Sequence, residues 1–383
     1  MITLDRLEIP RVECPVCNAA VPPGQFCGAC GSHMASGSAS RQHSFAAHPG
    51  EHVLHPSVVS TMFPHLPARQ SLPFRTSLAG GIALLVALGV SGLSGPAIAT
   101  AAFLVPLLYL LYIFDVDVYG DDAVLVMCFT FGLGIVTGVI WAVFTSHDLT
   151  AMVIQHAMTG TSIKDDIVFG ILLPLGAQVL MLVGAAAAYL WNQYDEVLDG
   201  FSAGVAGALG FTLASTMYNL WPELTQGMVS SAPVVNQTLL LLGRGILIPL
   251  IAGSATGLIA GAAWLRRSRA RSLQAHGWTT SLAAVIPFVA VMWAFLGLVN
   301  LLVESLAVVV AIYGAVAFVL VLAVRVALHH MLLAEAVDVR IGPDMVCMHC
   351  HHSVPRMAFC GTCGVATRAT PKSGTGKLFR AFR

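Results

Sequence analysis

The chain has 383 residues, of which 57% are hydrophobic and only 10% are charged, and its formal net charge is zero. Soluble domains carry about 25% charged residues, so this composition excludes an ordinary soluble protein and indicates an integral membrane protein. The zero net charge singles out no partner, so the distribution of charges along the chain is more informative than their sum.

A cysteine motif opens the chain within residues 1–34, where the sequence reads CPVCNAAVPPGQFCGACG. Its C-x2-C-x9-C-x2-C spacing comprises Cys14, Cys17, Cys27 and Cys30. Paired CxxC turns of this kind place four thiolates around a tetrahedral zinc ion, and the metal supplies folding energy that so small a module lacks. We therefore predict an N-terminal zinc ribbon, in which Gly28 and Gly31 permit the tight turns.

Residues 35–74 are rich in Ser, Ala, His and Pro, which predicts a flexible cytosolic linker. The first 70 residues are polar and cysteine-rich, so we expect no cleavable signal peptide before the first apolar segment.

A transmembrane helical domain is predicted over residues 75–330. It contains eight stretches that are long and apolar enough to cross a bilayer of about 30 Å: 77–94, 97–114, 124–145, 167–190, 198–219, 238–264, 280–302 and 305–328. Only Gly95 and Pro96 separate the first two, which predicts a tight helical hairpin. Prolines at 106, 174 and 249 should kink their helices.

Small residues concentrate in two of these segments. In lipid no hydrophobic force drives helices together, so small residues promote packing by letting backbones approach closely. We expect the fifth and sixth segments to pack closely against each other through Gly200, Gly204, Gly207, Gly210, Gly253, Gly257 and Gly261. The third segment adds Gly134 and Gly138.

Polar groups are scarce in the membrane segments, and three are candidates for a polar core. Asp199 is expected to cap the fifth helix, where a negative charge is favourable. Ser215 lies further along the same helix. Arg244 in the sixth segment either pairs inside the core or anchors the helix near the outer membrane surface.

A second cysteine motif, CMHCHHSVPRMAFCGTCG, lies within residues 338–367 and repeats the spacing of the first with Cys347, Cys350, Cys360 and Cys363. We predict a C-terminal zinc ribbon with turns at Gly361 and Gly364, and with His351 and His352 exposed rather than bound to the metal. Residues 368–383 form a basic tail with interleaved aromatics, a composition that suits an anionic membrane surface or nucleic acid, or a disordered charged end.

Basic residues predict the orientation. Arg266, Arg267, Arg269 and Arg271 follow the sixth segment, and both tails are basic, whereas Lys164 is the single basic residue of the opposite loops. By the positive-inside rule both termini are cytosolic, and the protein lies in the cytoplasmic (inner) membrane.

The cytosol keeps thiols reduced, which disfavours a disulfide at either cysteine motif and leaves redox use of one CxxC as a minor alternative. Ribbons in one compartment are able to pack as a double ribbon, a hypothesis that the repeated spacing supports.

The stretch YDEVLDGFSAGVAGALGFTLASTMYNLW resembles the PrsW family of intramembrane proteases, which is related to the CAAX-protease group. The match rests on Asp199, Gly200, Gly204, Gly210 and Phe211. The segment LGRGILIPLIAGSATGLIAG resembles the helix that follows in that family, through Arg244, Pro249, Thr256 and Gly257. The resemblance covers about residues 167–264 and implies a PrsW-like helical fold.

The catalytic residues of that family are not matched. Its paired glutamates would lie in the fourth segment, which offers only Gln178, and its Glu-Asn pair is replaced by Ser215 and Thr216. Its histidine would fall near Ala252. Glutamate and histidine are needed to bind metal or activate water, and a serine without a neighbouring base is not a nucleophile. A site rebuilt from acids at the helix ends, Asp121, Asp122, Asp195 and Glu196, is the alternative.

We therefore expect an all-α polytopic membrane protein of about eight transmembrane helices, with small zinc-ribbon modules and two structural Zn²⁺ ions at its termini. The expected function is a non-catalytic, PrsW-like scaffold or regulator that contacts the lipid bilayer and binds a protein partner through its ribbons. The alternatives are an active intramembrane metalloprotease with a displaced site, and a transporter or channel. Nucleic acid is a less favoured partner of the ribbons.

Overall fold

The computed structural model describes residues 10–35, 72–116, 123–159, 167–191, 197–226, 234–267, 278–336, 341–347, 349–365 and 367. The predicted linker, apart from its first and last few residues, and the predicted basic tail therefore lie outside the described residues. The four helix-end acids of the alternative catalytic site also lie outside the described residues: Asp121, Asp122, Asp195 and Glu196.

The first two helices form the predicted hairpin, but its turn lies earlier in the chain than expected. Helix α2 (Leu72–Val90) and helix α3 (Ser94–Val116) are joined through Gly92, whose φ of +73° is the left-handed conformation that glycine adopts easily. Gly95 and Pro96 belong to the first turn of α3 instead, a position where the missing N–H of proline leaves no hydrogen bond unmade.

The remaining helices follow the predicted segments closely. They are α4 (Ala123–Thr159), η1 (Val168–Leu172), α6 (Leu173–Met181), α7 (Val183–Tyr189), α8 (Val197–Gln226), α9 (Val234–Leu240), η2 (Leu241–Leu247), α10 (Ile248–Arg267), η3 (Trp278–Thr280), α11 (Leu282–Leu302) and α12 (Leu306–Ala336). Helix α4 continues about 14 residues beyond its predicted end at 145.

Two of the predicted kinks are π-helical turns. The π-turn η1 ends just before Pro174, and η2 ends just before Pro249. Proline has no N–H to donate to the preceding turn, and its ring crowds the carbonyl four residues back, so the helix widens locally. The N–H groups of Leu173 and Ile248 accordingly donate to carbonyls five residues earlier.

The fold is a helical membrane bundle with a cysteine module near each terminus, as predicted. Within the described residues, six segments are long and apolar enough to cross a membrane: Leu125–Ser146, Val168–Tyr189, Val197–Pro222, Val235–Arg267, Leu282–Leu302 and Leu306–Leu328. The other two predicted segments are helical and apolar but shorter over their described side chains, at Arg75–Val90 and Gly95–Leu108.

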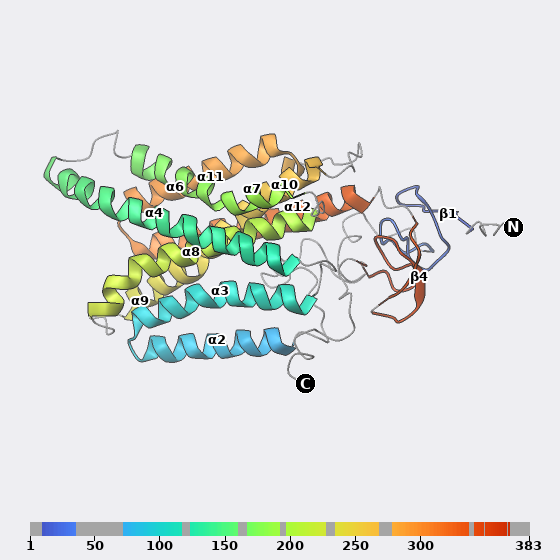
Figure 1. Ribbon diagram of the computed structural model, residues 1–383, viewed down its shortest axis with the longest axis horizontal. Coiled ribbons are helices and arrows are strands. Elements are labelled where there is room, and N and C mark those ends of the chain that lie inside the picture. Colours follow the sequence, from blue (N-terminus) through green and yellow to red (C-terminus); the bar gives the residue numbers. More distant parts are fainter. Residues whose placement is uncertain are drawn as a thin grey trace.

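Helix α8 is the centre of the bundle. Every residue from Val197 to Ala214 is buried, and the helix packs against α3, α4, α7 and α10. Figure 1 shows α8 running through the middle of the bundle, with α4 alongside it.

Glycines allow α8 to approach two helices on different sides. On the α10 side, a methyl group added to Gly204 would lie 2.8 Å from the backbone oxygen of Thr256, and one added to Gly257 would lie 2.7 Å from the Phe201 ring. On the α4 side, a methyl group added to Gly138 would lie 2.5 Å from the backbone oxygen of Phe211. Carbon atoms do not approach so closely, so glycine is required for both contacts. The α8–α10 contact is the one that the sequence indicated, and the α8–α4 contact is additional.

Six of the seven glycines of the predicted packing set lie at helix contacts of α8 or α10. Gly200, Gly204, Gly257 and Gly261 lie at the α8–α10 side, whereas Gly207 and Gly210 face backbone atoms of α4 and α6. Gly253 is buried within α10.

Each cysteine module contains one short antiparallel strand pair. Strand β1 (Val12–Glu13) pairs with β2 (Ala20–Val21), and β3 (Asp344–Val346) pairs with β4 (Ser353–Pro355). Both modules lie together beyond one end of the helical bundle (Figure 1).

Candidate metal centres

The four cysteines of each motif converge on one point. Each tetrad has all its sulfur atoms within 4.8 Å of one another, and the Cys14–Cys30 and Cys17–Cys27 sulfurs are 3.8 Å apart. The same 3.8 Å separates Cys347 from Cys363 and Cys350 from Cys360. This distance is nearly twice a disulfide bond of about 2.05 Å. It matches the edge of a tetrahedron with metal–sulfur bonds of about 2.3 Å, so both tetrads fit a tetrahedral metal ion.

Each CxxC pair closes by the same backbone turn. The residue after the second cysteine has a left-handed φ in all four turns: 58° at Asn18, 72° at Gly31, 59° at His351 and 72° at Gly364. Its N–H donates to the carbonyl of the first cysteine, as from Asn18 to Cys14 and from Gly364 to Cys360. Glycine and asparagine adopt this conformation readily. His351 therefore forms part of a turn, and both it and His352 are exposed.

The thiols within a tetrad differ in acidity. Hydrogen bonds from Cys17 and Cys27, with a further one from the Ser32 hydroxyl, lower the pKa of the Cys30 thiol to about 2. In the second tetrad burial alone would raise the pKa of Cys360, but backbone N–H donors of Cys363 and Thr362 lower it overall. One thiol in each tetrad is thus more acidic than an ordinary cysteine, whereas the pKa values of Cys17, Cys27, Cys347 and Cys363 are raised. Metal binding therefore has to displace protons from these thiols, because only the deprotonated sulfur coordinates.

A serine hydroxyl distinguishes the first tetrad from the second. Ser32 is fully buried, and its oxygen lies 2.9 Å from the Cys30 sulfur and 3.4 Å from the Cys14 sulfur. Val365 occupies the matching position of the second motif, where its carbonyl accepts from the Cys360 N–H as the Ser32 carbonyl does from the Cys27 N–H. The two tetrads therefore share ligands and backbone but differ in one donor to the sulfurs.

The two modules pack against each other as a double ribbon, which confirms the hypothesis drawn from their spacing. The Phe26 N–H donates to the Gly361 carbonyl, and the Phe359 N–H donates to the Gly28 carbonyl, each at 2.9 Å. Phe26 and Phe359 occupy equivalent positions in the repeated motif, as do the two glycines. The contact is therefore related by an approximate twofold axis, like the isologous interface of a homodimer.

This contact changes the role of two glycines. Gly28 and Gly361 were expected to permit the CxxC turns, but only Gly31 and Gly364 have left-handed φ values there. Gly28 instead makes room for the opposite ribbon, because a methyl group added to it would lie 2.5 Å from the Met357 sulfur. Similarly, a methyl group added to Gly24 would lie 2.6 Å from the Gly361 oxygen.

A polar network occupies the interior of the membrane bundle. The Gln178 amide nitrogen on α6 donates to the Thr256 hydroxyl on α10 at 3.1 Å, and the Trp293 indole N–H on α11 donates to the Gln178 oxygen at 2.6 Å. Gln178 and Thr256 are buried. A lone glutamine in an otherwise apolar segment was visible in the sequence, but its partners lie 78 and 115 residues away and could not be assigned from it.

The three predicted polar-core residues lie apart from this network. Asp199 is buried in the first turn of α8. The Ser215 hydroxyl donates to the Thr212 carbonyl of its own helix at 3.2 Å. Arg244 is exposed on the π-turn η2, nine residues after the start of its span at Val235, so its side chain is not part of the core and the anchoring alternative fits better.

The two cysteine tetrads are the only clusters of three or more metal-ligating side chains among the described residues. Comparison of the chain with protein-family models, with curated proteins and with solved structures finds no match.

Proposed function

We propose that this chain is a PrsW-like membrane protein that acts as a scaffold or regulator without proteolytic chemistry. Its docking surface is the double ribbon, with one structural zinc ion in each tetrad, on the cytosolic side of the cytoplasmic membrane. The observation that carries the proposal is the reciprocal Phe26–Gly361 and Phe359–Gly28 pairing, which joins both ends of the chain into one body next to the helical bundle.

The chemistry of the tetrads supports this role. Four cysteine ligands complete a tetrahedral shell and leave no open position for water or substrate, which is the arrangement of a structural rather than a catalytic zinc site. Bound metal would stiffen both modules, and a surface that is ordered before binding loses less conformational entropy when a partner docks.

The membrane core supports the absence of proteolysis. The PrsW-like resemblance would place catalytic acids in the fourth span, where Gln178 is a neutral amide bonded to Thr256 and Trp293. An amide with both its oxygen and its nitrogen engaged is neither a general base nor a strong metal ligand.

Affinity capture from membranes tests the docking role. The full-length protein is compared with Cys350→Ser, which removes one ligand of the second tetrad, and with Ser353→Ala, an exposed position on β4 as the matched control. We expect zinc content to fall from two ions per chain towards one in Cys350→Ser, together with loss of captured partner, while membrane insertion is unchanged. A partner retained equally by both variants would contradict docking through the ribbons.

A cleavage assay tests the competing protease function. Purified protein is incubated with candidate membrane substrates, with and without chelator, alongside Asp199→Asn, which neutralises the buried acid of α8. We expect no metal-dependent cleavage. Cleavage that is lost both with chelator and in Asp199→Asn would show an active protease.

A further inference from the structure

A groove opens on the side of the bundle between α3 and α4. Both helices pack on α8 but make few contacts with each other, so a stretch of α8 forms the floor between them. The groove has a volume of about 760 Å³ and is lined almost entirely by apolar side chains, including Phe103 of α3, Val139 of α4 and Leu213 of α8. Phe103 and Val139 are exposed within it, at 54% and 42%.

One end of this groove lies at a predicted membrane boundary. The apolar segments predicted from the sequence for these two helices end at 145 and 219, and Ser146 and Pro222 line the groove near those ends. The Ser146 and Tyr218 hydroxyls are 3.3 Å apart at this end, next to the exposed Trp221. Tyrosine and tryptophan gather at the membrane–water interface, because their rings are apolar and their tips are polar.

The groove is about as deep as one leaflet. From Ser146 it follows α4 to Ile135, which at 1.5 Å per residue is roughly 16 Å. Half of a hydrocarbon core of about 30 Å is about 15 Å. A transmembrane helix needs a surface that continues through both leaflets, whereas a lipid acyl chain runs from the interface to the midplane.

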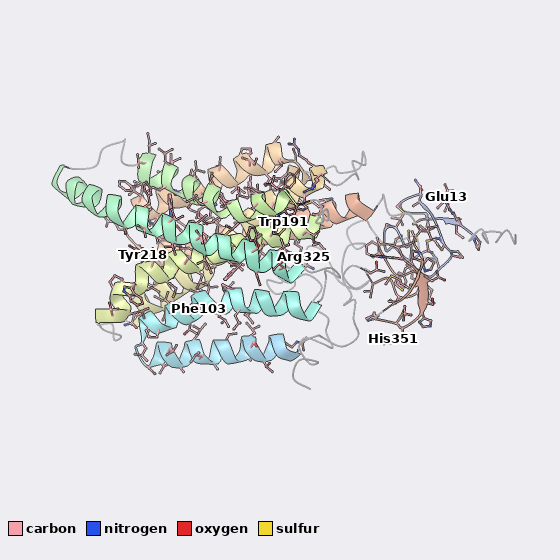
Figure 2. All side chains as sticks on the ribbon, viewed as in Figure 1. Glu13, Phe103, Trp191, Tyr218, Arg325 and His351 are labelled. Atoms are coloured by element: carbon pink, nitrogen blue, oxygen red, sulfur yellow. The ribbon has the colours of Figure 1, made fainter. Side chains whose placement is uncertain are left out.

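We propose that this groove binds one glycerolipid of the leaflet remote from the ribbons, with an acyl chain between α3 and α4 and its ester region at the Ser146–Tyr218 hydroxyl pair. Figure 2 shows Tyr218 and Phe103 in the half of the bundle away from the ribbon residues Glu13 and His351. The apolar walls bury the chain, and the hydroxyls meet the first polar groups of the lipid. This inference does not depend on the function of the ribbons.

Native mass spectrometry of the full-length protein tests the proposal. The protein is reconstituted in nanodiscs of palmitoyl-oleoyl phosphatidylcholine, released into detergent, and its retained phospholipid is counted. Val139→Trp fills the groove, and Val136→Trp is the matched control, because Val136 is exposed on the same helix but does not line the groove. We expect wild type and Val136→Trp to retain one phospholipid, and Val139→Trp to hold it about tenfold more weakly.

Tyr218→Phe provides a second variant, which keeps the ring and removes the hydroxyl. It should release the lipid about fivefold faster than wild type does. If wild type retains no more phospholipid than Val139→Trp does, or if Val136→Trp and Val139→Trp lose it equally, the groove is not a lipid site.

Discussion

Ser32 and Val365 occupy equivalent positions in the two motifs and make the two metal sites unequal. The Ser32 hydroxyl lies within hydrogen-bond distance of two sulfurs of the first tetrad, whereas the Val365 side chain has no polar atom to offer the second tetrad. Groups that hydrogen-bond to metal ligands hold them in place, and losing one typically reduces metal affinity by about 10–100-fold.

For the proposed zinc-loaded protein, we therefore expect the second site to lose its ion first. Release of zinc to a chromogenic chelator, followed over time, should show a fast phase from the second site and a slow phase from the first. Val365→Ser should slow the fast phase. Ser32→Val should speed the slow phase by about tenfold or more. Equal release from both sites in all three proteins would exclude a role for the serine.

The Gln178 network gives a second prediction at the residue scale. Gln178→Leu removes the acceptor of the buried Trp293 N–H, and Thr256 keeps only its contact with the Met181 sulfur, which should lower the free energy of unfolding by about 1–3 kcal/mol. Trp293→Phe removes the donor itself, so the double variant should lose less stability than the sum of the two single variants. Thermal unfolding of the four proteins in detergent measures this coupling, and strictly additive losses would contradict it.

At the scale of elements, the glycines of α8 set how closely three helices approach. A methyl group at Gly204 meets both the Thr256 oxygen and the Ala260 methyl group at 2.8 Å, so α10 would have to move. Gly132 on α4 has no atom within 4 Å of an added methyl group, which makes it a matched control.

Gly204→Ala should accordingly destabilise the bundle by about 1–3 kcal/mol, as expected for overpacking. Gly132→Ala should be close to neutral. The stability of both variants is measured as the shift in Tm of the detergent-solubilised protein. If both substitutions shift Tm equally, the close approach of α8 and α10 does not require glycine at position 204.

Much at this scale could be predicted from the sequence. Hydropathy located all eight apolar helices, and the glycine spacing located the contact of α8 with α10. The sequence did not indicate that α4 lies on another side of α8, because Gly134 and Gly138 carry no information on which helix they meet. The same limit applies to Gln178, whose partners depend on the tertiary packing of α6, α10 and α11. The π-turns before Pro174 and Pro249 were expected only as kinks.

At the scale of the whole molecule, the double ribbon joins the two ends of the chain. The repeated spacing predicted two modules, but Gly28 and Gly361 were assigned to turns, because a sequence does not distinguish glycine needed for conformation from glycine needed for close approach. In the structure they lie where Phe26 and Phe359 donate across the contact. Each ribbon therefore supplies hydrogen-bond acceptors to the other, and breaking one tetrad should loosen both.

Hydrogen exchange of the full-length protein, followed by mass spectrometry, tests this central claim most directly. The N–H of Phe26 belongs to the first ribbon but depends on the second, so Cys360→Ser should remove protection from the segment containing Phe26 as well as from that containing Phe359. The segment of α8 from Val197 to Ala214 should stay protected, because it is buried within the bundle and the cysteine tetrads lie outside the bundle. If Phe26 keeps its protection in Cys360→Ser, or if α8 loses its protection, the ribbons do not form the single separate module proposed for docking.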